Sequence, residues 1–152
     1  MNRYYIIKDH VFEILETYSH GRRRIEGYIH LSNVVQLSMI LAKKRNLDEE
    51  LAATIAILHD IAIYRYQSHF DHARRSSMLA KEILDSSKLF QQEEINCITH
   101  AISLHSNKDT IDDEYSECIK DSDLYSQYLQ EKEAVFSKEK EKRILLLQKE
   151  FS

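Results

Sequence analysis

Along most of the chain, apolar residues recur at the three- and four-residue spacing of amphipathic helices, and polar stretches separate these segments. The pattern predicts six helices, over about 3–18, 29–46, 48–62, 71–85, 92–106 and 113–130, and a seventh in the C-terminal segment 131–152. Gly21 marks the end of the first helix, and Asp48 is well placed to cap the third. We therefore expect an all-α fold, a compact bundle of about six to seven helices.

Composition supports this prediction and excludes several other classes. The 152 residues suffice for one domain with a substantial core, so we treat 1–152 as a single domain. Proline is absent and there are only 2 glycines, which excludes turn-rich β-sandwiches and glycine-rich phosphate loops. Cys97 and Cys118 match no zinc or redox spacing and are predicted to be small core residues.

Charge and hydropathy indicate where the protein works. The formal net charge is −4, so we expect no nucleic acid polymer and no membrane among its partners. The N-terminal residues lack the pattern of a signal peptide, and we expect a soluble, cytoplasmic protein. Near the C-terminus, charged residues should form a solvated face. The cluster Ile144–Leu147 should pack on the domain or on a second subunit of a homodimer.

Several polar residues lie on faces that are otherwise apolar. His30 shares its face with Val34 and Leu37, and His59 and Asp60 lie on adjacent alanine-rich stripes of the third helix. A carboxylate in such a setting needs a strong partner, because an unpaired buried charge is costly. Adjacent helical residues diverge by about 100°, so we expect the pair not to touch. The two side chains can still reach one ion above the ridge between them.

Two further histidines repeat this pattern, and one aspartate borders it. His72 and His105 lie on apolar stripes of later helices, while Asp123 lies at the edge of the apolar face of segment 113–130. Any single histidine of this kind is commonly a hydrogen-bonded core residue, but four on four helices favour a shared site. Asp121 is expected to point to solvent. The remaining histidines, for which we expect surface or loop positions, are His10, His20, His69 and His100.

The order of these residues resembles the signature of the HD-domain superfamily of metal-dependent phosphohydrolases, as in a small single-domain bacterial-type member. The segments that carry the resemblance are 27–32 with His30, 51–61 ending in the pair His59-Asp60, 72–84, 101–108 and 120–123. They cover about 22–130, which we take as the core of the domain, and leave 131–152 as a C-terminal helix.

The resemblance implies a metal site and a reaction. His30, His59, Asp60 and Asp123 would bind one divalent ion, which their mixed nitrogen and oxygen donors suit to Mn, Fe, Co, Ni or Mg. Asp60, His72 and His105 would be the catalytic residues, and the two histidines would contact phosphate or hold a second ion. The implied activity is release of phosphate or pyrophosphate from a small phosphorylated substrate, with a nucleotide as the first expectation.

Basic residues near this site are predicted substrate contacts. Arg23, Arg24 and Lys108 can neutralise the charge of a phosphate, although the arginine run also fits an exposed turn. The segment after Asp60, Ile61-Ala62-Ile63-Tyr64, carries neither the lysine nor the glutamate that many relatives place there. The proton donor to the leaving group is therefore unassigned.

Two other functions remain open at this point. Some members of the superfamily are di-iron oxygenases with a larger histidine set, and this chain has enough histidines for one. A non-catalytic sensor domain that binds a metal or nucleotide is the second alternative.

Overall fold

The computed structural model describes residues 1–152 as helices joined by short loops, without a strand. The helices are α1 Asn2–Tyr18, α2 Gly21–Lys44, α3 Glu49–Leu58, α4 Ile61–Tyr66, α5 His72–Ser87, α6 Gln92–Leu104, α7 Glu114–Gln130 and α8 Lys138–Phe151. The short helix α4 directly follows α3, and counting the two as one interrupted helix gives the predicted seven. The all-α prediction is confirmed.

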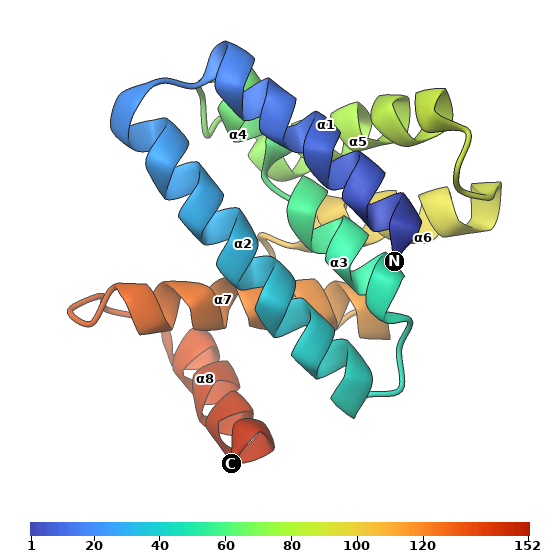
Figure 1. Cartoon of the computed structure of the whole chain (residues 1–152). Coiled ribbons are helices and arrows are strands. Elements are labelled where there is room, and N and C mark those ends of the chain that lie inside the picture. The colour runs from blue at the N-terminus through green and yellow to red at the C-terminus, as the bar shows by residue number, and fades with distance from the viewer.

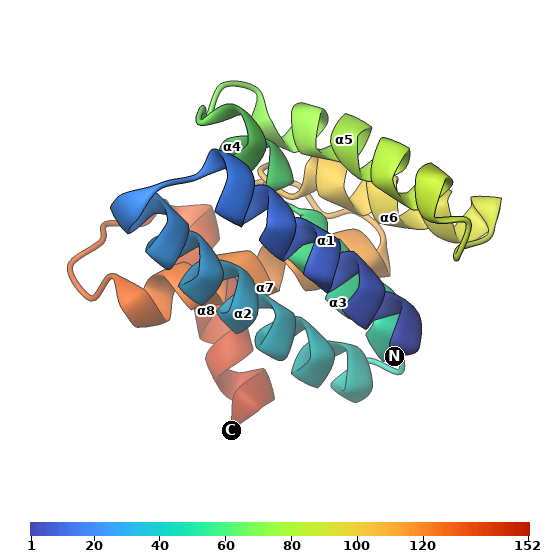
Figure 2. The same ribbon diagram turned by 45° about the horizontal axis from the view of Figure 1, so that its top comes forward.

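Helix α3 lies at the centre of the bundle. Helix α1 crosses one side of it, α2 and α7 pack on another, and the neighbouring pair α5 and α6 closes the remaining side (Figures 1 and 2). Every residue from Ala52 to Leu58 is buried. A helix that is apolar on all faces is stable only when other helices surround it, which explains this position.

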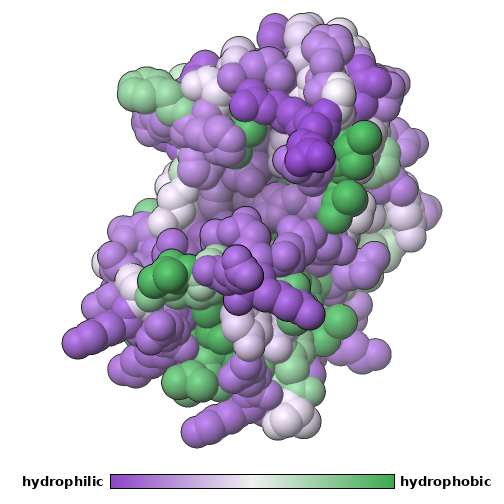
Figure 3. Space-filling view, turned by 90° about the vertical axis from the view of Figure 1, so that its left-hand side faces the viewer, coloured by the Kyte–Doolittle hydropathy of each residue, from purple (hydrophilic) through white to green (hydrophobic).

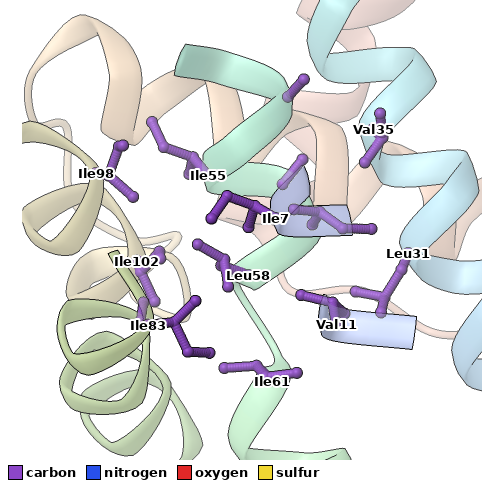
Figure 4. Close-up of a cluster of buried hydrophobic side chains, with 14 of the residues drawn as sticks. Ile7, Val11, Leu31, Val35, Ile55, Leu58, Ile61, Ile83, Ile98 and Ile102 are labelled. Carbon is purple, nitrogen blue, oxygen red and sulfur yellow. The ribbon is translucent and has the colours of Figure 1, made fainter. Parts of the chain in front are cut away.

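The main core forms where these helices meet α3. Ile55 and Leu58 of α3 contact a cluster that includes Ile7 of α1, Leu31 of α2 and Ile102 of α6 (Figure 4). All of these side chains are almost fully buried. Each buried aliphatic side chain of this size stabilises the fold by about 1.5–3 kcal/mol, so this cluster holds the helices that surround the polar residues described below.

The chain leaves helical geometry at the pair His59-Asp60. Helix α3 ends at Leu58 and α4 begins at Ile61, so the prediction of one continuous helix through residue 62 is wrong. The Oγ of Ser76 in α5 accepts a hydrogen bond from the Ala62 N–H at 3.0 Å, which satisfies a donor in the first turn of α4. A side chain from another helix therefore stabilises the interruption.

Helix α2 begins earlier than the sequence pattern predicts. Its first residue is Gly21, which has a φ of +56°, a conformation that glycine adopts without strain. The arginines Arg22, Arg23 and Arg24 are therefore in the first turn of a helix and not in an exposed turn.

The loop between α2 and α3 ends at Asp48. The Asp48 carboxylate accepts a hydrogen bond from the Leu51 N–H, which confirms Asp48 as the cap of α3.

The C-terminal helix α8 packs on α7. Ile144 and Leu147 are buried, whereas Leu145 and Leu146 are 60% and 59% exposed. The apolar cluster of the tail thus packs on the domain through two of its four residues. A second subunit over the other two stays a prediction.

Asp121 of α7 corrects another expectation. Its side chain is buried rather than solvent-exposed, because Arg45, directly after α2, and Arg143 of α8 bind its two oxygens at 2.7 and 2.8 Å. The apolar pattern does not show this burial because charged side chains, not apolar ones, cover Asp121.

Cys118 is buried and Cys97 is half-buried, and both are free thiols. None of the helices combines the length and apolar character needed to cross a bilayer.

Candidate metal centre

Four side chains from three parts of the chain bring their donor atoms together near the interruption between α3 and α4. His30 comes from α2, His59 and Asp60 from the interruption, and Asp123 from α7. The His30 Nε2 lies 3.3 Å from the His59 Nε2, 3.4 Å from the Asp60 Oδ2 and 3.2 Å from the Asp123 Oδ1. The predicted ligand set thus converges on one point, and we call it the first cluster.

The interruption changes the geometry of the pair itself. The His59 Nε2 lies 3.2 Å from the Asp60 Oδ2, so the expectation that these adjacent residues do not touch is wrong. A continuous helix would turn the two side chains apart by about 100°. Because Asp60 has left helical geometry, both side chains face the same point.

A second cluster shares one residue with the first. The other carboxylate oxygen of Asp60, Oδ1, lies 3.1 Å from the His105 Nε2 and 3.6 Å from the His72 Nε2. Asp60, His72 and His105 can therefore hold an ion of their own. Asp60 can thus bind one ion through Oδ2 and a second ion through Oδ1.

Backbone carbonyls orient three of the histidine rings. The Nδ1 atoms of His59, His72 and His105 lie 2.6, 3.1 and 2.7 Å from the carbonyl oxygens of Ala56, His69 and Ile102. A carbonyl oxygen only accepts, so each Nδ1 carries a proton and each Nε2 is the atom that faces the cluster. Imidazole nitrogens this close to carboxylate oxygens need a positive charge between them, which either a proton on Nε2 or a bound metal ion can supply.

The charges of the cluster shift the pKa values of its members. Burial of the His59 ring lowers its pKa, but the carboxylates of Asp60 and Asp123 outweigh this effect and raise it to about 10. Burial raises the pKa of both carboxyl groups, but His59 and the other histidines bring that of Asp60 well below its usual range, and Lys108 together with His30 and His59 does the same for Asp123. The carboxyl groups are thus ionised, and the centre favours a bound positive charge.

The distances between the donor atoms fit a metal ion. A cation about 2.1 Å from each ligand places neighbouring ligand atoms about 3.0–3.4 Å apart. In the first cluster, the separations between the histidine nitrogens and between these and the carboxylate oxygens are 3.2–3.5 Å. Two imidazoles and two carboxylates, with no thiolate, suit an exchangeable divalent ion with open coordination positions more than a closed structural zinc site.

The family model that matches this chain is the HD domain, over residues 27–128. The chain belongs to the HD domain family. The matched range includes all six residues of the two clusters, so the family match and the geometry identify the same centre. No curated protein and no solved structure matches the chain.

In this HD domain, Lys108 lies behind the candidate ligand Asp123. Its ammonium group donates to the Asp123 Oδ2 at 2.7 Å and to the His105 carbonyl at 3.0 Å. It orients the carboxylate so that Oδ1 faces the first cluster. The phosphate contact predicted for Lys108 stays a prediction.

A cavity of about 720 Å³ adjoins the first cluster, a size typical of small-molecule sites. His30, Asp60, His72 and Asp123 line it, together with Arg23 at the start of α2. Viewed from the end where α2 begins, the molecule is hollowed, and the recessed atoms are hydrophilic (Figure 3). The open face of the centre therefore suits a polar ligand.

The two predicted arginine contacts differ in position. Arg23 lines the cavity. The Arg24 guanidinium donates to the carbonyl oxygens of Ser19 and Glu16, so it binds the end of α1. Substrate contact by Arg24 stays a prediction.

Tyr64 and Gly27, which also line the cavity, were not assigned a role from the sequence. One feature of the sequence singles out each of them. Tyr64 lies one helical turn beyond Asp60, and Gly27 is an isolated glycine within a helical pattern, which often marks a close approach.

Proposed function

We propose that this HD domain is a metal-dependent phosphohydrolase that releases phosphate or pyrophosphate from a small phosphorylated compound, with a nucleotide as the expected substrate. The family and its complete His/Asp ligand set indicate a metal-dependent hydrolase. The observation that carries the proposal is the convergence of four donor atoms beside an open, polar cavity.

Each residue of the centre has a definable task. A bound divalent ion lowers the pKa of a coordinated water and polarises a phosphoryl oxygen. Asp60 holds the two clusters at a fixed distance because one rigid carboxylate serves both. His105 is almost fully buried and is therefore placed to hold an ion, whereas His72 also reaches the cavity.

The charge balance favours an anionic substrate. Asp60 and Asp123 are the two carboxylates of the clusters, so one divalent ion neutralises them and a second makes the centre positive. Arg23 on the cavity wall adds a further cation. A phosphate group is the common small anion that this arrangement attracts.

The second cluster favours one other function. Two adjacent ions bridged by a carboxylate also suit a di-iron oxygenase. Two tightly bound irons per chain together with substrate-dependent oxygen consumption would select this function, whereas exchangeable ions with phosphate release select hydrolysis.

The test is a screen of phosphate and pyrophosphate release. Purified protein is stripped of metal, reloaded with Mn²⁺, Co²⁺, Ni²⁺ or Mg²⁺, and incubated with nucleotides and phosphomonoesters. We expect release that depends on the added metal and is absent in an Asp60→Asn variant. Release that is equal in this variant would show that the activity comes from a contaminant, and no release with any metal would contradict the proposal.

A further inference from the structure

The cavity wall contains a tyrosine hydroxyl that has no partner in the protein. Tyr64 of α4 is 6% exposed and lines the cavity beside Asp60 and Asp123. Its main-chain carbonyl accepts hydrogen bonds from Ser19 and Gln67, but its hydroxyl takes part in none. The hydroxyl is also not among the polar atoms sealed from solvent, so it is open to a molecule in the cavity.

A glycine determines where this ring lies. A Cβ added to Gly27 of α2 would lie 2.6 Å from the Tyr64 Cε1 and 3.0 Å from Leu15. Glycine within a helix costs about 1 kcal/mol relative to alanine, so its presence in α2 needs a compensating gain. The gain here is space for the Tyr64 ring at the cavity wall.

The surroundings keep this hydroxyl protonated. Burial raises the Tyr64 pKa above its usual value, and the carboxylates of Asp60 and Asp123 raise it further, while Arg23 lowers it slightly. The side chain is therefore a protonated, neutral donor among charged groups.

The other groups of the cavity that could transfer a proton are less suitable. Glu26, His69 and Glu131 line the same cavity but are exposed to solvent. Arg23 does not give up its proton in water. His72 belongs to the second cluster, where its Nε2 lies 3.6 Å from the Asp60 Oδ1. Of the titratable cavity residues outside the two clusters, Tyr64 is the one that is both buried and able to give up a proton.

We infer that Tyr64 is the proton donor to the leaving oxygen, an assignment that rests on the hydrolysis proposed above. As a water oxygen bonds to phosphorus, the bond from phosphorus to the leaving oxygen breaks, and that oxygen takes the proton of the Tyr64 hydroxyl. The attacking water gives one proton to solvent and the tyrosinate takes one from it, so the net reaction consumes one water. A departing alkoxide is a stronger base than an ordinary phenolate, and a cation held by Asp60 and Asp123 would offset the two carboxylates that raise the Tyr64 pKa, which would favour this transfer.

The test compares leaving groups in a Tyr64→Phe variant, which keeps the ring and removes only the hydroxyl. For a nucleoside monophosphate, whose leaving group is an alkoxide, we expect kcat to fall about 100-fold or more. For p-nitrophenyl phosphate, whose leaving group needs no proton, we expect a fall of less than about fivefold. Metal content, measured by elemental analysis, should equal that of the wild type.

Two further variants control the comparison. Tyr28→Phe removes the hydroxyl of a half-buried tyrosine of α2. This hydroxyl bonds to Glu16 and to the Phe12 carbonyl outside the cavity, so its loss should leave both rates unchanged. Gly27→Ala should displace the Tyr64 ring and reproduce the selective loss, with a circular dichroism spectrum like that of the wild type.

The outcomes separate the inference from the proposed function. Equal rates in Tyr64→Phe and wild type, or an equal loss for both substrates, would overturn the role of Tyr64 and leave the hydrolysis intact. A wild-type protein that releases neither phosphate nor pyrophosphate from any nucleotide or phosphomonoester would overturn the proposed function itself.

Discussion

A single carboxylate, that of Asp60, connects the two halves of the metal centre. Its Oδ2 lies 3.2 Å from His59 and its Oδ1 lies 3.1 Å from His105. Both histidines are fixed in turn by carbonyl groups three residues earlier. The centre therefore has a rigid bridge and preoriented rings, so little conformational entropy is lost when an ion binds.

We predict that Asp60→Asn removes metal from both clusters. The amide keeps the shape of the side chain but loses its charge, and its nitrogen cannot replace an oxygen ligand. Metal affinity should fall by more than the roughly 10–100-fold that loss of an outer-shell partner causes. Elemental analysis after dialysis measures this, with the exposed Asp109→Asn as the matched control. Retention of metal by Asp60→Asn would contradict the bridging role.

Glu50 of α3 should make the stability of the fold depend on pH. Burial raises its pKa, but hydrogen bonds from the chain's amino group and from Arg3 outweigh this and lower it to about 2. Because the pKa in the folded protein is below the usual value, ionised Glu50 stabilises the fold above about pH 4.5. This contribution is lost as the pH falls towards 2.

Glu50→Gln should therefore lower the free energy of unfolding at pH 7 by about 1–3 kcal/mol. The difference from the wild type should shrink between about pH 4.5 and pH 2, where the wild-type carboxylate becomes protonated. Urea unfolding at several pH values measures it. Glu93→Gln is the control, because Glu93 is an exposed acid in the first turn of α6 and should show a smaller, flatter effect.

At the scale of elements, the interruption between α3 and α4 makes the site. It lets His59 and Asp60 face one point, and it places Tyr64 one turn further along the same short helix. Ser76 of α5 stabilises it through the Ala62 N–H. The geometry of the centre thus depends on a side chain of α5, the helix that also carries His72.

We predict that Ser76→Ala lowers stability by about 1 kcal/mol and also weakens metal binding. The Ala62 N–H would lose its buried partner, and Asp60, at the start of α4, would be held less firmly. Chemical unfolding and metal titration measure the two effects. In the control Ser77→Ala, which removes a bond to the Thr99 carbonyl of α6, stability should fall without a change in metal affinity. Unchanged metal affinity in both variants would show that the interruption does not need Ser76.

At the scale of the whole molecule, the metal centre joins elements that are distant in sequence. Its ligands come from α2, the α3–α4 interruption, the start of α5, the end of α6 and α7. An ion at either cluster binds the folded state only, because the unfolded chain does not bring the residues of a cluster together. Metal binding and folding are therefore linked.

We predict that metal stabilises the folded protein against heat. At a free metal concentration 100 times the Kd, the free energy of unfolding should rise by about 2.7 kcal/mol. For a domain of this size, this corresponds to an increase of roughly 5–10 °C in Tm. Thermal unfolding with and without a chelator measures it, and Asp60→Asn should show no increase. An identical Tm with and without metal in the wild type would contradict the prediction.

The sequence by itself determined the helices and the ligand set. Spacing alone predicts segments close to α1, α5, α6 and α7, because apolar residues repeat with the period of a helix whatever they pack against. The order of His30, His59-Asp60 and Asp123 predicts the first cluster through its resemblance to the HD-domain signature, and that order is a property of the sequence alone. The HD domain match confirms the family to which that order belongs.

Only the tertiary structure decided the rest, because it depends on which surfaces meet. The interruption after Leu58 depends on Ser76, the burial of Asp121 depends on arginines directly after α2 and in α8, and the shared role of Asp60 depends on rings from α5 and α6. The position of Tyr64 depends on Gly27 of another helix. Hydrophobic periodicity reports whether a face is apolar, but it carries no information about the polar partners that cover a charged one.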